Sequence, residues 1–316
     1  MSTVHDQRTG SVPPRADEIP TEVVRLRYPG RWVTACVLVL LGVLLVQQLI
    51  VNKRFQWDVF WQYLFSPQIL VGLQRTLILT VIAMAIGIVL GTLLAIMRLS
   101  RNPVMRTASG LYIWFFRGTP LLVQLIFWYN LAALYPSLVV GIPSGPGIDL
   151  GATNLVISTW GAAILGLGLN EAAYMAEIIR GGLLSVDRGQ VQAAESIGMT
   201  DSLVLRRIVL PQALRVIVPP TGNQVVGMLK YTSLVSVIAL PELLYSAQLI
   251  YTQNFQPIPL LLVACFWYLL VTSLLTIGQG FLERHYGRGF KRTDASTPGR
   301  WNRLQARLKT KESMGR

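Results

Sequence analysis

Long apolar segments separated by shorter polar ones dominate the pattern of this chain. A helix rises 1.5 Å per residue and the hydrocarbon core of a bilayer is about 30 Å thick, so about 20 apolar residues are enough to cross it. The segments that reach this length are Val33–Val51, Leu70–Met97, Leu111–Leu134, Leu155–Ile179, Val216–Leu240 and Ile258–Leu282. The pattern therefore predicts an all-α, polytopic membrane protein with six transmembrane helices.

The polar stretches divide the chain into four parts. Residues 1–31 are polar and proline-containing, which predicts a disordered tail. Residues 32–51 form an additional first transmembrane helix, and no small-residue cleavage site follows it, so we expect it to be retained. Residues 69–283 form a core of five transmembrane helices, and residues 284–316 form a basic tail.

Composition supports this interpretation. Only 14% of the 316 residues are charged, against about 25% in soluble domains, so the chain has too little charge to cover itself in water. The net charge is +13, and the segment 284–316 alone holds ten basic and two acidic residues. Such a tail suits an anionic membrane surface. Nucleic-acid binding is the other common meaning of a basic chain, but the core is too apolar for it.

Basic residues gather on one side of the predicted membrane. With the N-terminus inside, the inner segments carry Arg25, Arg27, Arg31, Arg98, Arg101, Arg106, Arg180, Arg188, Arg206, Arg207, Arg215 and the basic tail. The outer side carries only Lys53, Arg54 and Arg75, and the outer loops 135–154 and 243–257 have no basic residue. Because cytoplasmic loops retain Lys and Arg, both termini are predicted to be cytoplasmic.

The connection Gly181–Arg215 is too polar to cross the bilayer, yet its apolar residues recur at helical spacing. This pattern predicts short amphipathic helices in the cytoplasm, with Asp201 in a capping position before the second. Within it the sequence runs Gln192-Ala193-Ala194, three residues, Gly198, nine residues, then Ile208-Val209-Leu210-Pro211. Small alanines would let a short helix seat closely on a partner, Gly198 would permit a tight turn, and Leu210-Pro211 would end the segment.

This spacing resembles the EAA loop of ABC importer permeases, with Gln192 in place of the glutamate. Further segments look like the polar amino acid importers: Gly72–Leu77, Phe116–Gln124, Ala172–Gly182, Leu210–Arg215 and Lys230–Ile238. The resemblance implies a permease subunit in the bacterial cytoplasmic membrane. Its coupling residues would be Gln192, Ala193, Ala194, Gly198, Ile208, Leu210 and Pro211.

The resemblance also implies partners. These are a cytoplasmic ABC ATPase dimer that holds ATP and Mg, a second permease chain of the same or a homologous sequence, and an extracytoplasmic amino acid-binding protein. Membrane lipid surrounds the chain, and no cofactor is expected on it. The role of the first helix, which lies outside the usual family core, stays open.

Ionisable groups inside the bilayer are costly and therefore functional candidates. Glu171 could hold the ammonium group of an amino acid or a cationic side chain, or it could pair with Lys230 or with backbone. Lys230 could otherwise meet a substrate carboxylate. Gln124 and Ser233 complete the substrate-pathway candidates. Glu177 lies three residues before Arg180 on the same helix, a spacing that favours a structural ion pair.

Two further residues or motifs stand in the predicted spans. Arg117, in a Gly-Thr-Pro context, is expected at the cytoplasmic interface, near lipid phosphate or the coupling loop. The stretch Gly87–Gly91 is a GxxxG pattern, which permits close helix approach.

The sequence contains no G-x-x-x-x-G-K-[ST] loop for ATP and no cluster with metal-ligand spacing. We therefore expect a transport subunit, not an enzyme, whose energy comes from another chain. One alternative is a secondary transporter of small polar solutes driven by an ion gradient, which would show an internal repeat. A membrane-embedded enzyme would need clustered catalytic side chains, and the scattered Glu and Lys residues argue against it.

Overall fold

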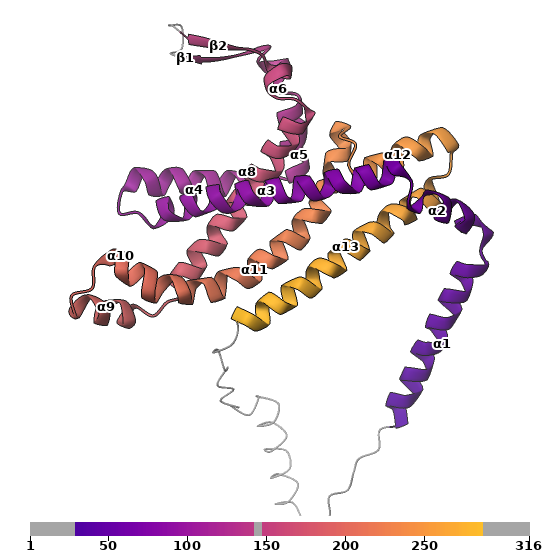
Figure 1. Ribbon diagram of the computed structural model, residues 1–316, viewed down its shortest axis with the longest axis horizontal. Coiled ribbons are helices and arrows are strands. Elements are labelled where there is room, and N and C mark those ends of the chain that lie inside the picture. The colour runs from indigo at the N-terminus through magenta and orange to yellow at the C-terminus, as the bar shows by residue number, and fades with distance from the viewer. Residues whose placement is uncertain (1–28, 142–146, 287–316) are drawn as a thin grey trace, which may run out of the picture. The chain divides into compact units, whose positions relative to one another are not determined.

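A computed structural model describes residues 29–141 and 147–286, and its main elements are helices (Figure 1). Most of the two predicted tails lies outside these residues. The chain divides into two units, residues 1–55 and 56–316. The first contains α1 (Pro29–Val51) and the short helix η2 (Lys53–Phe55). The stretch Trp32–Val51 of α1 is long and apolar enough to cross a membrane, in agreement with the predicted first helix.

The second unit begins with α2 (Trp57–Leu64) and α3 (Pro67–Leu99). Pro67 occupies the first turn of α3, where its missing N–H costs nothing. A Cβ on Gly87 would lie 2.5 Å from the Glu171 side chain, and one on Gly91 would lie 2.6 Å from Met175 Cβ. The GxxxG pattern therefore lets α3 approach the helix that carries Glu171 and Met175, α8 (Thr159–Leu184), as expected.

The third predicted span is not one continuous helix. The structure divides this part of the chain into α4 (Pro103–Gly118), α5 (Leu121–Tyr129) and α6 (Leu131–Leu134), with a bend of 100° between α4 and α5. Thr119 and Pro120 are both extended, at ψ 142° and 134°. Proline disfavours the helical conformation of the residue before it, and it has no N–H to continue the helix. The helix therefore stops at Gly118 and restarts after Pro120.

A small sheet interrupts the otherwise helical fold between α6 and α8. Strands β1 (Ser137–Gly141) and β2 (Gly147–Ala152) form an antiparallel pair, followed by α7 (Thr153–Val156). The all-α prediction is wrong for this short hairpin, because the run Leu138-Val139-Val140 favours an extended chain.

Helix α8 forms the centre of the core. Thirteen of its residues are buried, and it packs against α3, α4, α5 and α11 (Leu210–Tyr231). Small residues make this possible: Ala163, Gly166 and Ala173 bring neighbouring backbones close. A second, smaller core joins α2, α12 (Leu243–Asn254) and α13 (Pro257–Tyr286).

The long connection after α8 folds into the two short helices that its pattern predicts, α9 (Arg188–Ser196) and α10 (Asp201–Val204). The predicted cap is wrong: Thr200 is the N-cap of α10 and Asp201 its first residue, while Asp187 caps α9 by accepting from the Gly189 N–H at 2.6 Å.

Leu210 and Pro211 do not end the segment as predicted. The turn η3 (Leu205–Val209) is a π-helix that leads directly into α11. Because Pro211 has no N–H, it cannot donate the usual helical hydrogen bond, and the turn just before it is a wider π-helical turn in a chain that remains helical. Pro219 and Pro220 lie inside α11.

The fifth predicted span also breaks near its end. After α11 the chain forms η4 (Thr232–Ile238), and then α12, which is bent by 44° from the preceding helical stretch. The predicted outer loop 243–257 is therefore mainly the helix α12. Glu242 caps this helix by accepting from the N–H groups of Leu244 and Tyr245 at 2.9 and 2.8 Å. In the described residues, four helices can cross a membrane, and six spans result if each bent pair is counted as one.

Candidate functional site

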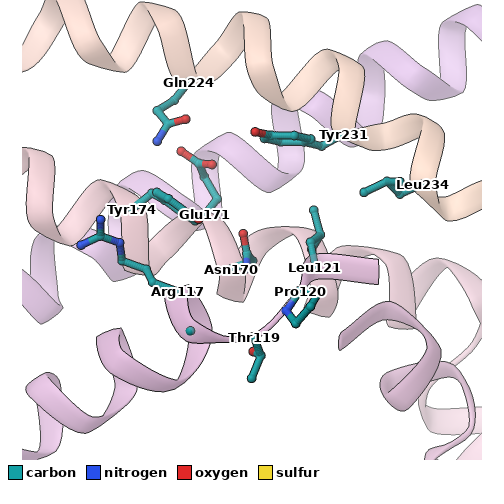
Figure 2. A pocket seen from close by; sticks show the side chains of 11 residues that line it. Arg117, Thr119, Pro120, Leu121, Asn170, Glu171, Tyr174, Gln224, Tyr231 and Leu234 are labelled. Atoms are coloured by element: carbon teal, nitrogen blue, oxygen red, sulfur yellow. The ribbon is translucent and has the colours of Figure 1, made fainter. Parts of the chain in front are cut away.

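A polar cavity of about 320 Å³ lies where the α4–α5 bend meets α8, α11 and η4 (Figure 2). Its volume falls at the lower end of the range of small-molecule sites. The lining residues are Arg117, Gly118, Thr119, Pro120, Leu121, Asn170, Glu171, Tyr174, Gln224, Tyr231 and Leu234. Residues from parts of the chain more than 100 positions apart thus build one site.

Glu171 is the acidic residue of this cavity. Only 2% of its surface is exposed, and its Oε1 atom has no hydrogen-bond partner among the described residues. Figure 2 shows its carboxylate turned toward Gln224 and Tyr231. Buried polar atoms are nearly always paired in folded proteins, so an unpaired carboxylate oxygen facing a cavity fits a site for a hydrogen-bond donor or a cation.

Two other pathway candidates lie elsewhere. Lys230 is exposed and is not among the residues that line the cavity, and it forms no ion pair with Glu171 in the described part of the chain. Ser233 is half-buried, and its hydroxyl donates to the Lys230 carbonyl oxygen at 2.7 Å. The structure therefore places Glu171 in the cavity but not Lys230 or Ser233.

The fourth pathway candidate, Gln124, holds the bend. Its side-chain nitrogen donates to the carbonyl oxygens of Phe116 and Thr119 at 3.0 and 3.2 Å, and to the Thr119 hydroxyl at 2.7 Å. Asn170 of α8 donates to the same Phe116 oxygen at 3.0 Å and to Gln124 Oε1 at 3.2 Å. A broken helix leaves carbonyl groups unpaired, which hydrocarbon cannot satisfy. These two amides supply the missing donors.

Charged and aromatic groups extend the site beyond Glu171. The Arg117 guanidinium lies 5.3 Å from the centre of the Tyr174 ring, within cation–π range. One turn farther along α8, Glu177 and Arg180 form the predicted ion pair at 2.7 Å. Arg117 was expected only at the interface, and Tyr174 was missed. The spacing of Tyr174 three residues after Glu171, on one helix face, is the signal that could have found it.

The EAA-like segment forms a defined surface on α9. Ala194 is buried, whereas Gln192 and Ala193 are exposed. Gly198 has a φ of +83°, and the Met199 N–H bonds back to the Ala194 carbonyl oxygen at 3.1 Å, so the glycine ends the helix in the left-handed turn that other residues rarely adopt.

The same surface includes an apolar side chain. Ile197 is 79% exposed at the end of α9. Gln190 on α9 accepts from the Gln212 side chain of α11 at 2.7 Å, which ties the short helix to the long one. Of the remaining coupling candidates, Ile208 is half-buried and Leu210 and Pro211 are exposed.

Comparison with known proteins gives a consistent result. The family model described as "Binding-protein-dependent transport system inner membrane component" matches residues 87–288. The arginine transport system permease protein ArgU of Corynebacterium glutamicum is 46% identical, over 87% of this chain and 85% of that protein. The probable amino-acid permease protein YxeN of Bacillus subtilis is 36% identical, over 73% of this chain and 97% of that protein.

A solved structure agrees with the sequence comparisons. The crystal structure of an amino acid ABC transporter with histidines contains a chain that is 33% identical to this one. The two superpose with a TM-score of 0.60, over 73% of this chain and 98% of the other. The likeness covers most of the described residues, and it extends from sequence to fold.

Proposed function

This chain belongs to the family of binding-protein-dependent transport system inner membrane components, and we propose that it takes part in amino-acid import in the following way. The chain is the membrane-spanning permease subunit of an ABC importer for amino acids, as its relatives and its structural neighbour support. The same comparisons do not support the ion-gradient alternative.

The unpaired carboxylate oxygen of Glu171 is the observation that carries the substrate assignment. Every amino acid has an ammonium group, and a buried carboxylate favours a cation that replaces its lost hydration. The name of the 46%-identical relative specifies arginine. We infer a substrate with a cationic side chain, arginine first, whose ammonium or guanidinium group meets Glu171.

Arg117 is suited to the opposite end of such a substrate. Its guanidinium lies over Tyr174, and Arg117 lines the same cavity as Glu171. A guanidinium presents paired N–H donors that match the geometry of a carboxylate. An amino acid held between Glu171 and Arg117 would satisfy both charges.

The partners follow from the family and from α9. An ABC ATPase dimer, which holds ATP and Mg, would dock on the α9 surface of Ala193 and Ile197 from the cytoplasm, the side on which both termini would lie. A second permease chain, of the same or a homologous sequence, would complete the pathway. An extracytoplasmic binding protein would deliver the amino acid. Two breaks, at Thr119–Pro120 and at Ala239–Pro241, are then the points where closure of the ATPases would move the spans.

Co-purification tests the coupling assignment. Ile197→Arg and Ala193→Arg change exposed side chains of α9, and Gly198→Val disturbs the turn that ends it. We expect each to weaken retention of the ATPase on the tagged permease, while Ser202→Arg, an exposed position on α10, retains it. Wild-type retention and uptake in all three α9 variants would contradict the assignment.

A further inference from the structure

A second cavity, of about 470 Å³, lies among α3, α8, α11 and α13. It uses different residues of α8 and α11 from those that line the polar cavity. Its lining is almost wholly aliphatic and includes Ile96 of α3, Ile179 of α8, Leu214 and Val218 of α11, and Leu282 of α13. Figure 1 shows α3 and α13 diverging, with α11 between them.

This cavity offers no free hydrogen-bonding side chain. The two hydroxyl groups in its lining belong to Thr92 and Thr221. Thr92 donates to the Ile88 carbonyl oxygen of its own helix at 2.7 Å, and Thr221 donates to that of Ile217 at 2.8 Å. A cavity of this kind does not hold water, which needs two or more polar partners. An aliphatic ligand is the chemistry that it accepts.

Three of the walls belong to helices that could span a membrane. Helices α3, α8 and α13 are each long and apolar enough to span a membrane. A space between such helices is accessible to lipid tails, and an aliphatic chain there would gain the dispersion contacts that an empty cavity forfeits.

The sequence places two arginines close to residues that line one end of this cavity. Leu205, Leu210 and Leu214 line that end, where η3 leads into α11. Arg206 lies four residues before Leu210 and Arg215 three before Val218, spacings that place each arginine on the side of its lining neighbour. Both arginines are exposed. A dry aliphatic space with exposed guanidinium groups at its end is complementary to an acyl chain joined to a phosphate.

We propose that this cavity binds one acyl chain of an anionic phospholipid, whose headgroup phosphate contacts Arg206 and Arg215. The site is separate from the amino-acid cavity and does not depend on which amino acid is carried. Bound there, the acyl chain would fill the cavity between α3 and α13 and would pack against α11. The N-terminal end of α11 connects to α9 through η3 and α10.

Lipid binding to the purified full-length protein tests the proposal. Native mass spectrometry with added phosphatidylglycerol or phosphatidylcholine of identical acyl chains measures both affinities. We expect phosphatidylglycerol to bind more tightly to the wild type. Leu214→Trp and Val218→Trp fill the cavity and should weaken both lipids about tenfold, the loss expected when two buried methylene groups are excluded. Val216→Trp is the matched control, because Val216 is exposed on the same helix and outside the lining.

The headgroup contact has its own variants. Arg206→Gln and Arg215→Gln should each weaken phosphatidylglycerol about fivefold and should weaken phosphatidylcholine less, because the choline cation offsets the charge of its phosphate. Arg101→Gln, an exposed arginine after α3, should change neither. These surface variants keep the test decisive if a tryptophan variant does not fold.

Three results would overturn the proposal. The first is equal binding of the two lipids to the wild type. The second is wild-type lipid binding by folded Leu214→Trp and Val218→Trp proteins. The third is loss of permease dimers in those variants with lipid binding intact, which would make the apolar cavity a contact between copies of this chain.

Discussion

The side-chain amide of Asn170 donates to the main-chain oxygen of Phe116 at 3.0 Å, so α8 directly holds the last turn of α4 at its bend. Asn170 immediately precedes Glu171, the buried acid of the cavity. One short stretch of α8 therefore both stabilises the broken helix and presents the carboxylate beside it. The same stretch of α8 thus contributes to both the bend and the polar cavity.

The Gln124 amide is predicted to be essential to the bend. Gln124→Leu keeps a similar volume but removes the donor to the Thr119 oxygens and the oxygen that accepts from the Asn170 amide. A buried polar group left without a partner costs about 1–3 kcal/mol, so we expect a lower thermal unfolding temperature in detergent. Gln212→Leu, which removes a more exposed amide on α11, serves as the control. If both substitutions lowered the unfolding temperature equally, the claim that Gln124 stabilises the bend would be contradicted.

Glu171 is predicted to matter for transport and not for assembly. Glu171→Gln keeps the shape of the side chain and removes its charge, so uptake of a cationic amino acid should fall about tenfold, the loss expected for one charged hydrogen bond. Retention of the ATPase should not change. Glu177→Gln breaks only the ion pair with Arg180 and should preserve uptake far better. Equal loss in the two variants would place Glu171 outside the pathway.

The close contact of α3 with α8 is predicted to tolerate no side chain at Gly91. A Cβ there would lie 2.6 Å from Met175 Cβ and 3.0 Å from the Ala172 carbonyl oxygen. Gly91→Val should therefore destabilise the protein by about 1–3 kcal/mol, as overpacking of a tight core does. Val89→Leu, two residues earlier on an exposed face, is the control in the same thermal assay. If the Gly91→Val and Val89→Leu proteins had the same unfolding temperature, the close packing of α3 on α8 would be contradicted.

Glu242 is predicted to hold α12 in place. It is fully buried, and besides capping α12 it accepts from the Tyr268 hydroxyl of α13 at 2.8 Å. Tyr268→Phe deletes that donor and should cost about 1.5–3 kcal/mol, the range for hydrogen bonds to charged groups. Hydrogen exchange of the α12 amides should rise in this variant. Tyr245→Phe is the control, because it keeps the backbone N–H of Tyr245 that donates to Glu242, and it should leave the exchange of the α12 amides unchanged. Equally fast exchange in Tyr245→Phe would contradict the role given to the Tyr268 hydroxyl.

The sequence predicts the long spans well for a simple physical reason. Helices α3, α8 and α13 have between 26 and 33 residues, and their apolar runs need no information from elsewhere in the chain. The turn at Gly198 was also predictable, because a positive φ favours glycine. Glu171 could be found because an acid within an apolar span is expensive.

The breaks were beyond local reasoning. Pro120 suits the first turn of a helix and also the end of one, and the choice is made by Gln124 and by Asn170, which lies 50 residues later. Likewise, Pro211 predicts the end of a helix, but the chain stays helical from the π turn η3 into α11. The aromatic and amide walls of the cavity, Tyr231 and Gln224, come from a helix whose position only the fold determines.

One measurement tests the central claim most directly: uptake of labelled arginine by proteoliposomes that contain the permease with its ATPase, and that have the binding protein outside. We predict accumulation that requires hydrolysable ATP inside and persists when ionophores dissipate proton and sodium gradients. Uptake that continues with a non-hydrolysable ATP analogue and collapses with the ionophores would contradict the account.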